Sequence, residues 1–194
     1  MAKSTATHRS AAITTVGHGS RSASELIAVL RAAGVARVID VRSYPASRRW
    51  PWFGREALER ALAESGVGYA WMGRALGGKR RARADDRARH PALAPGLAAF
   101  ARHMEGARFA GACDGLAARA DDERLALLCA ERDPRQCHRW LIADYLVLVA
   151  GVAVRHWLAP GRAGAHCPSA AARLADDGRL RYDLGCTGAL LDTD

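Results

Sequence analysis

Short apolar runs alternate with amphipathic helical segments along most of this chain, and this alternation limits the folds open to it. Residues 11–16 form a β-branched run. A helical segment follows, which begins at the capping box of Ser22 and Glu25 and ends at Gly34, and residues 36–41 form a second apolar run. Two strands joined by one helix normally lie parallel with a right-handed crossover. This first unit therefore predicts a parallel sheet.

The same alternation continues toward the C-terminus. It predicts further helices over residues 55–65, 96–105, 108–120 and 138–150, and further strands over 68–72, 124–130 and 152–157. We predict an α/β fold, a single-domain three-layer sandwich with a mostly parallel sheet, Rossmann-like or flavodoxin-like. Residues 73–95, dense in Arg, Asp and Ala, are expected to form a mobile surface loop. The α/β domain is expected to span residues 11–158, between a flexible N-terminus (1–10) and a C-terminal appendage (159–194).

The net charge of +9 comes almost entirely from arginine, because Lys3 and Lys79 are the only lysines. Such a charge favours an anionic small molecule or a nucleic acid as partner, although solvated surface arginines are the more common explanation of a basic pI. No apolar run reaches the roughly 18 residues of a membrane span, and residues 1–10 do not resemble a secretory signal. We therefore expect a cytoplasmic protein with no membrane partner; the oligomeric state stays open.

The five cysteines have neither the density nor the context of a disulfide scaffold, so reduced thiols are expected. A predicted strand delivers Cys129, and after a Pro-containing turn Cys137, His138 and Arg139 begin a long apolar helix. A helix N-terminus and neighbouring cations lower the pKa of a thiol and make it nucleophilic. We predict Cys137 as the nucleophile or redox thiol and Cys129 as the second thiol, although an inert half-buried Cys137 fits the pattern as well.

Other interpretations of the two thiols stay open. The spacing from Cys129 to Arg135 matches the Cys-x5-Arg loop of phosphatases, but two acids and a proline inside the loop argue against a phosphate cradle. Cys129 and Cys137 could also form a redox pair. A metal set of soft and imidazole ligands could comprise Cys129, Cys137, His138 and His18. The sequence does not indicate a cofactor, and our leading prediction includes no metal-binding residue.

Polar residues follow three of the predicted strands directly, and the carboxyl ends of parallel strands are where such sheets bind ligands. We predict a pocket for an anionic or phosphate-bearing substrate at this edge, with His138 or His18 as the acid or base. Its candidate substrate-binding residues are Ser20, Arg21, Asp40, Arg42, Arg48, Glu131 and Arg139. The alternative for this group is a structural network of ion pairs.

An aromatic loop follows the second strand and contains Trp50, Trp52 and Phe53. It could form a pocket wall or a platform for stacking nucleic-acid bases, whereas packing against the domain is the more common use of such residues. Together with the basic residues 80–89, this loop supports a competing function, that of a non-catalytic nucleic-acid-binding module.

Several motifs in order along the chain resemble the domain-of-unknown-function 488 family. They lie at residues 15–21, 40–48, 76–78, 129–131 and 137–139, within a span of about 12–158. The resemblance implies a compact α/β domain whose shared residues include these cysteines, histidines and arginines, and it implies no particular reaction. The chain departs from the family in the arginine-rich segment 80–89 and after Pro160. The sequence thus predicts a cysteine-dependent enzyme with an anion pocket, with a nucleic-acid-binding module or a metal or redox thiol protein as alternatives.

Overall fold

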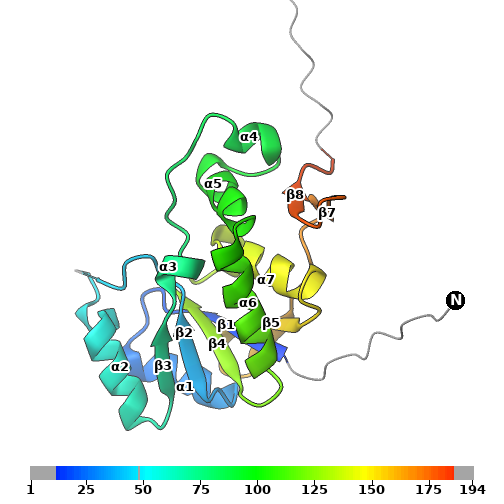
Figure 1. Cartoon of the computed structure of the whole chain (residues 1–194). Helices are drawn as coiled ribbons and strands as arrows, with labels where there is room; N and C mark the ends of the chain where they lie inside the picture. Colours follow the sequence, from blue (N-terminus) through cyan, green and yellow to red (C-terminus); the bar gives the residue numbers. More distant parts are fainter. Residues whose placement is uncertain (1–11, 48, 186–194) are drawn as a thin grey trace, which may run out of the picture.

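A six-stranded sheet in the order β3-β2-β4-β1-β5-β6 forms the centre of the computed structural model, which describes residues 12–47 and 49–185 (Figure 1). The strands are β1 (Ala12–Gly17), β2 (Arg37–Asp40), β3 (Gly68–Trp71), β4 (Leu125–Cys129), β5 (Ala153–Ala159) and β6 (Arg162–Ala165). β1 to β5 are all parallel, and β6 lies antiparallel to β5 at one edge. The predicted mostly parallel α/β sheet is confirmed.

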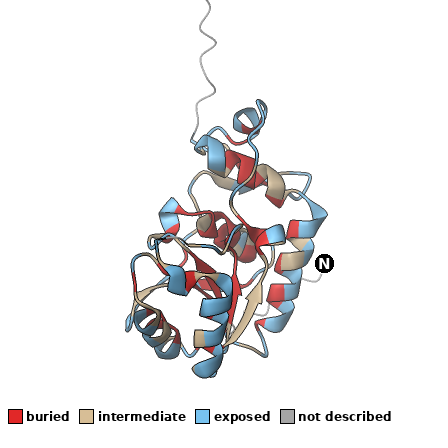
Figure 2. Ribbon diagram, turned by 90° about the vertical axis from the view of Figure 1, so that its left-hand side faces the viewer, coloured by how far each residue is buried: buried red, intermediate tan, exposed pale blue. Residues whose placement is uncertain are grey.

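Helices cover both faces of the sheet, as the alternation of buried side chains along the strands requires. In β4, Ala126 and Leu128 pack with α1 (Ala23–Ala32) and α2 (Arg55–Glu64). Leu125, Leu127 and Cys129 pack on the other face with α5 (Pro95–Met104), α6 (Ala107–Arg119) and α7 (Arg139–Leu148). The buried residues accordingly gather in the middle of the molecule (Figure 2), and the three-layer sandwich is confirmed.

β4 lies between β1 and β2, with Leu128 in register with Val16 of β1 and Asp40 of β2. The chain therefore runs outward from β1 through β2 to β3, and then returns to fill the gap. This order is neither the Rossmann order 3-2-1-4-5-6 nor the flavodoxin order 2-1-3-4-5, although the doubly wound principle is the same. Its consequence is that the carboxyl ends of β1, β2 and β4 lie side by side.

Residues 73–95 are more ordered than the predicted mobile surface loop. They contain α3 (Gly73–Leu76) and α4 (Asp86–Arg89), and both Asp86 and His90 are buried. Arg102 of α5 donates a hydrogen bond to the Asp86 carboxylate and so holds α4 against α5. A dense run of charges predicts a solvated loop only where the charged side chains stay exposed. Here Asp86 is buried and pairs with Arg102.

The residues after β5 continue the domain. β6 extends the sheet, and β7 (Ala172–Leu174) pairs with β8 (Leu180–Tyr182) as a small antiparallel hairpin. Leu180 and Tyr182 are buried in the same core cluster as α6 and α7. The expected flexible N-terminus, residues 1–10, lies outside the described residues. Among the described helices, none combines the length and apolar character needed to traverse a lipid bilayer.

Candidate active site

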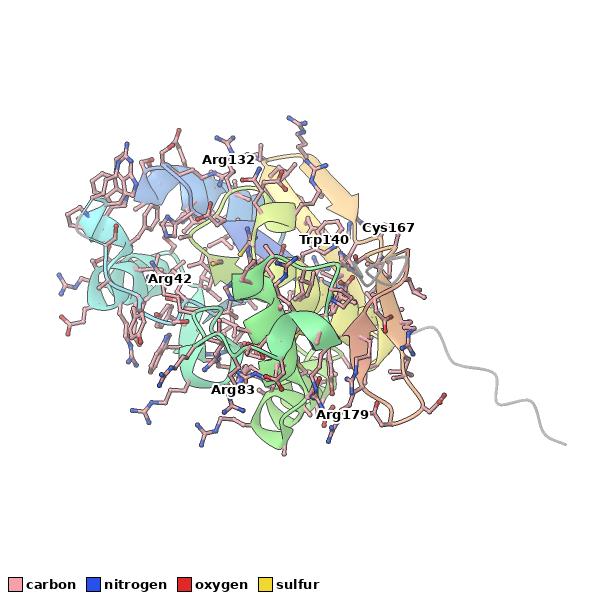
Figure 3. All side chains as sticks on the ribbon, turned by 90° about the horizontal axis from the view of Figure 1, so that it is seen from above. Arg42, Arg83, Arg132, Trp140, Cys167 and Arg179 are labelled. Carbon is pink, nitrogen blue, oxygen red and sulfur yellow. The ribbon has the colours of Figure 1, made fainter. Side chains whose placement is uncertain are left out.

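The loops that follow β1, β2 and β4 meet around one cavity of about 1240 Å³. His18 and Ser20 line it from the β1 loop, Arg42 from the β2 loop and Glu131 from the β4 loop, and Cys129, Cys137 and His138 also line it. Two backbone hydrogen bonds, from His18 N to Cys129 O (2.9 Å) and from Gly19 N to Ala130 O (2.8 Å), hold the first and third loops together. Figure 3 looks down onto this end of the molecule and labels Arg42.

The two cysteines reach the cavity from different elements. Cys129 is the last residue of β4, whereas Cys137 follows the short 3-10 helix η2 (Pro134–Gln136) in extended conformation. His138 is the N-cap residue of α7, so the predicted helix start at position 138 is one residue early and Cys137 lies just outside the first turn. Both thiols are nearly buried, with 6% and 3% of Cys129 and Cys137 exposed.

The imidazole of His138 lies next to both sulfurs. Its Nδ1 is 3.5 Å from Cys137 Sγ and 3.9 Å from Cys129 Sγ. Its Nε2 is 3.2 Å from the carbonyl oxygen of Val41, which can only accept, so Nε2 carries a proton. Phe100 packs edge-on against the ring, with centroids 5.0 Å apart. The imidazole is thus fixed so that Nδ1 is the nitrogen available to the thiols.

The pKa values of the two thiols shift in opposite directions. The Cys129 thiol donates to the Cys137 sulfur, and this hydrogen bond is the largest cause that holds the pKa of Cys137 well below its usual range. Burial opposes the shift, while the contact with His138 and the charges of His138 and Arg139 reinforce it. The same hydrogen bond and burial raise the pKa of Cys129. Of the two, Cys137 is therefore the thiol that loses its proton more readily.

Arg139 lies behind the thiol pair and does not line the cavity. Its side chain is only 1% exposed, and it donates to the Glu131 carbonyl oxygen and, over 3.4 Å, to Thr15 Oγ1. A Cβ at Gly17 would overlap with that same carbonyl and with the guanidinium, so glycine allows the close approach of the β1 and β4 loops here. No carboxylate pairs with Arg139 within the described residues.

Asp40 and Arg42 form a buried bidentate ion pair. Nε and Nη2 of Arg42 lie 2.9 and 2.6 Å from the two carboxylate oxygens, and Nη1 donates to Phe53 O over 2.8 Å. Tyr69 also donates to Asp40, over 2.8 Å. Only one edge of Arg42 thus remains for a ligand. Asp40 itself does not line the cavity.

The Arg21 side chain binds backbone carbonyl oxygens. Its guanidinium donates to the carbonyl oxygens of Gly17 and Leu158, and it does not line the cavity. Asp40 thus forms an ion pair with Arg42, as the alternative of a structural ion-pair network requires, whereas Arg21 and Arg139 bind backbone carbonyl oxygens. Ser20, Arg42 and Glu131 face the cavity. The remaining candidate, Arg48, lies outside the described residues.

His18 faces the cavity as a neutral imidazole. Burial lowers its pKa to about 4. Its Nδ1 donates to Gly19 O over 3.0 Å, and its Nε2 lies 3.4 Å from Arg42 Nη1. The ring stacks on Phe53, with centroids 4.1 Å apart. Phe53 is consequently buried and unavailable for stacking with a base, and of the three aromatic residues in that loop only Trp50 lines the cavity.

Three cations that were not among the predicted substrate-binding residues also line the cavity, namely Arg49, Lys79 and Arg80. The backbone N–H of Lys79 donates to Ser43 Oγ over 2.9 Å, which ties this loop to the loop after β2. The signal in the sequence was Gly77-Gly78. A Cβ at Gly77 would overlap with Ser43 Oγ and one at Gly78 with His138 Nδ1, so only glycine lets this loop approach the site. Among the described lining residues Glu131 is the one carboxylate, so cations dominate.

Cys129, Cys137 and His138 could together hold a metal ion, because their donor atoms all lie within 4.8 Å of one another. Tetrahedral zinc with ordinary bond lengths places a sulfur and a nitrogen ligand about 3.6 Å apart, close to the spacing of Cys137 Sγ and His138 Nδ1. His18, the fourth member of the predicted metal set, is not part of this cluster.

Comparison with known families agrees with the motifs. The model of the family described as domain of unknown function DUF488 matches residues 22–146, well over half of the chain. The chain belongs to the DUF488 family. The matched span includes Arg42, both thiols and His138, whereas His18 and Ser20 precede it and β5 and the later strands follow it. No curated protein and no solved structure matches the chain.

Proposed function

We propose that this DUF488 protein is a cysteine-dependent enzyme that acts on an anionic, phosphate-bearing small molecule, with Cys137 as the nucleophile. The observation that carries the proposal is the pairing of a thiolate with an imidazole at the wall of a cavity whose charged lining is mostly cationic. A buried thiolate is an effective nucleophile when a neighbouring base can accept and donate protons, and cations attract the anionic substrate to the thiolate.

Each residue has a distinct task in this proposal. Cys137 supplies the electron pair that forms a bond to the electrophilic centre as the bond from that centre to the leaving group breaks, and Cys129 stabilises the resting thiolate through its S–H. His138 supplies a proton to the leaving group, because its Nδ1 is the imidazole nitrogen that faces the sulfurs. His18 is a poorer candidate for this task, since its pKa of about 4 keeps it neutral and Arg42 Nη1 lies against its free nitrogen.

The substrate class follows from the cavity lining. Arg49, Lys79 and Arg80 line the cavity with positive charge, and guanidinium and ammonium groups are the usual protein ligands of phosphate. Apolar surface from Leu97 and Trp50 accompanies them. A phosphate-bearing metabolite with a partly apolar body fits both the cations and the apolar residues of this lining. The reduced thiols fit a cytoplasmic setting.

Thiol labelling with iodoacetamide over a range of pH tests the nucleophile. Arg132 and Arg135 lie between the two cysteines, so tryptic peptides report Cys129 and Cys137 separately. We expect Cys137 to be alkylated well below the ordinary thiol pKa of about 8.5, and Cys129 to remain unlabelled there. A labelling midpoint of Cys137 close to the ordinary value would overturn the proposal.

Protection by pyrophosphate tests the substrate class. We expect pyrophosphate to slow the alkylation of Cys137 in a saturable manner, and Lys79→Ala or Arg80→Ala to weaken this protection. Arg135→Ala is the matched control, because Arg135 is exposed and pairs with Asp133 outside the cavity. Unchanged labelling at saturating pyrophosphate would contradict a phosphate-bearing substrate.

Two competing functions give different outcomes in the same preparation. A nucleic-acid-binding module would be retained on an oligonucleotide column with steep salt dependence, and Cys137→Ser would leave this retention unchanged. A zinc protein would contain stoichiometric zinc, and Cys137 would become reactive only after treatment with a chelator. Either result would replace the enzyme proposal.

A further inference from the structure

A buried chain of polar side chains lies behind the thiol site and begins at Asp144 in α7. Oδ1 of Asp144 lies 2.8 Å from Nε2 of His166 and accepts the backbone N–H of Ser169 over 2.9 Å. Asp144 and His166 are both buried. His166 and Ser169 follow β6, so the segment beyond the central sheet supplies this end of the chain.

The chain continues through β5 to β1. Nδ1 of His166 lies 2.9 Å from Nε2 of His156, and Nδ1 of His156 lies 2.7 Å from Thr15 Oγ1. Trp140, labelled in Figure 3 beside this region, stacks on His156 with ring centroids 5.1 Å apart and packs edge-on against His166 at 4.5 Å. The aromatic cover excludes water, and each link is then a hydrogen bond in a low-dielectric environment.

Two features of this chain follow from its chemistry. A carboxylate oxygen can only accept, so His166 Nε2 donates to Asp144 Oδ1, which also accepts the Ser169 N–H. Burial lowers the pKa of His156 to about 4, which keeps its imidazole neutral. A neutral imidazole has one donor and one acceptor nitrogen, so His156 joins the Thr15 hydroxyl to His166 in one continuous chain.

Arg139 lies at the other end. A hydroxyl oxygen has two lone pairs, so Thr15 Oγ1 can accept from Arg139 Nη1, 3.4 Å away, in addition to its hydrogen bond with His156. Within the described residues no carboxylate contacts this buried guanidinium, and its Nε has no partner. The chain thus connects the Asp144 carboxylate to Arg139, whose other hydrogen-bond acceptor is the carbonyl oxygen of Glu131.

We propose that Thr15, His156, His166 and Asp144 are positioning residues of the thiol site, which hold the Arg139 guanidinium against the Cys129–Cys137 pair. This inference rests on the proposed function, since it assigns the chain to the same thiolate. It also brings the segment after β5, which the sequence suggested to be an appendage and which lies outside the family match, into the catalytic machinery.

Thr15→Val tests the inference, because it removes the hydroxyl and keeps the shape of the side chain. The readout is the ratio of Cys137 alkylation rates with iodoacetate and iodoacetamide, since an anionic reagent senses the Arg139 charge and a neutral one does not. We expect the ratio to fall about three- to tenfold and the labelling midpoint to move to higher pH. Thr14→Val is the matched control: Thr14 is also buried in β1, and its side chain points to the other face of the sheet.

Further variants separate positioning from stability. Thr15→Ser keeps the hydroxyl and is expected to retain the ratio of the unaltered protein. Asp144→Asn is expected to lower the ratio, and the double variant with Thr15→Val should behave as Thr15→Val alone, because both changes interrupt one chain. A merely structural network would lower the melting temperature in these variants and leave the ratio and pH profile unchanged, which would overturn the inference.

The two proposals fail in different ways. If Cys137 of the unaltered protein is labelled with an ordinary pH profile, the proposed function fails. If the unaltered protein shows the low profile and Thr15→Val shares it, the thiolate stands and the positioning chain alone is wrong. Additive effects of Thr15→Val and Asp144→Asn would likewise contradict a single chain.

Discussion

Gly78 packs so closely against the imidazole of His138 that a Cβ at position 78 would overlap with Nδ1. The ring cannot shift away from Gly78, because Val41 O binds its other nitrogen and Phe100 packs against it. The nitrogen that Gly78 approaches is also the one that faces the two sulfurs. The orientation of His138 therefore depends on the absence of a side chain in the neighbouring loop.

Gly78→Ala is expected to displace the His138 ring and to slow alkylation of Cys137 near neutral pH by at least about tenfold, because small misplacements at such sites have large effects on rate. Gly96→Ala is the matched control: Gly96 lines the same cavity, and its Cβ would meet nothing within 4 Å. Peptide mapping after short exposure to iodoacetamide measures both variants. Equal rates in the two would show that the Gly78 contact is not needed.

Asp40→Asn is expected to lower the free energy of unfolding by about 3 kcal/mol, since it leaves the buried Arg42 guanidinium without its carboxylate. Asp133→Asn, which removes the partner of exposed Arg135, is expected to lower it by less than about 1 kcal/mol. Urea denaturation at neutral pH measures both. A comparable small loss in the two variants would mean that water reaches the Asp40–Arg42 pair.

The stability of the fold is expected to fall as the pH is lowered from about 6.5 toward 5. Burial lowers the pKa of His18 and of His156 from 6.5 to about 4 in the native protein. Within this window the unfolded chain binds protons that the native protein does not, so acid favours unfolding. The loss attributable to each histidine is on the order of 1–2 kcal/mol at the acid end of the window.

Urea denaturation at several pH values measures this slope. Burial lowers the pKa of His90 and His103 as well, and these two residues act in the same direction. His156→Gln removes one titrating group and is expected to reduce the slope, whatever it does to the stability at neutral pH. A slope that is flat in the unaltered protein, or the same in His156→Gln, would contradict the assignment.

Gly17→Ala is expected to destabilise the fold by at least about 3 kcal/mol, because its Cβ would overlap with backbone atoms of Glu131, which cannot move as a side chain would. Gly111→Ala, at an exposed position in α6 where a Cβ meets nothing within 4 Å, is expected to stabilise it by up to about 1 kcal/mol. Thermal unfolding of the two variants should shift in opposite directions, and a shift of the same sign would contradict this interpretation.

The layers of the fold were predictable from local patterns, but the strand order was not. The uninterrupted apolar run of β4 indicates a strand buried on both faces, and the capping box at Ser22 marks the start of α1. Nothing in either pattern places β4 between β1 and β2, because the order of strands depends on how whole layers pack. The charged segment 73–95 misled for a related reason, since the burial of Asp86 depends on Arg102 of another helix.

The candidate site was predictable to the extent that its residues lie at or just after the ends of strands, as Cys129 and Arg42 do. Which arginines remain free for a ligand could not be predicted. Arg21 and Arg139 are bound by backbone carbonyl oxygens, which every residue carries and no sequence pattern marks. Arg80 enters the site from a distant loop, and the sequence signal for the approach of that loop is the adjacent pair Gly77-Gly78, whose neighbours leave no room for a Cβ.

The insertion of β4 into the gap between β1 and β2 has a consequence for how the protein forms in time. β2 pairs with β3 as soon as both exist, but β1 pairs only with β4 and β5, so it has no neighbour until the chain has passed residue 125. Pairings of such long sequence separation form slowly, and strands with open edges associate with other chains meanwhile. We therefore expect a newly made chain to depend on chaperones until β4 enters. The strand that fills the gap is the one that ends in Cys129, so the thiol pair cannot form before that strand has entered the sheet.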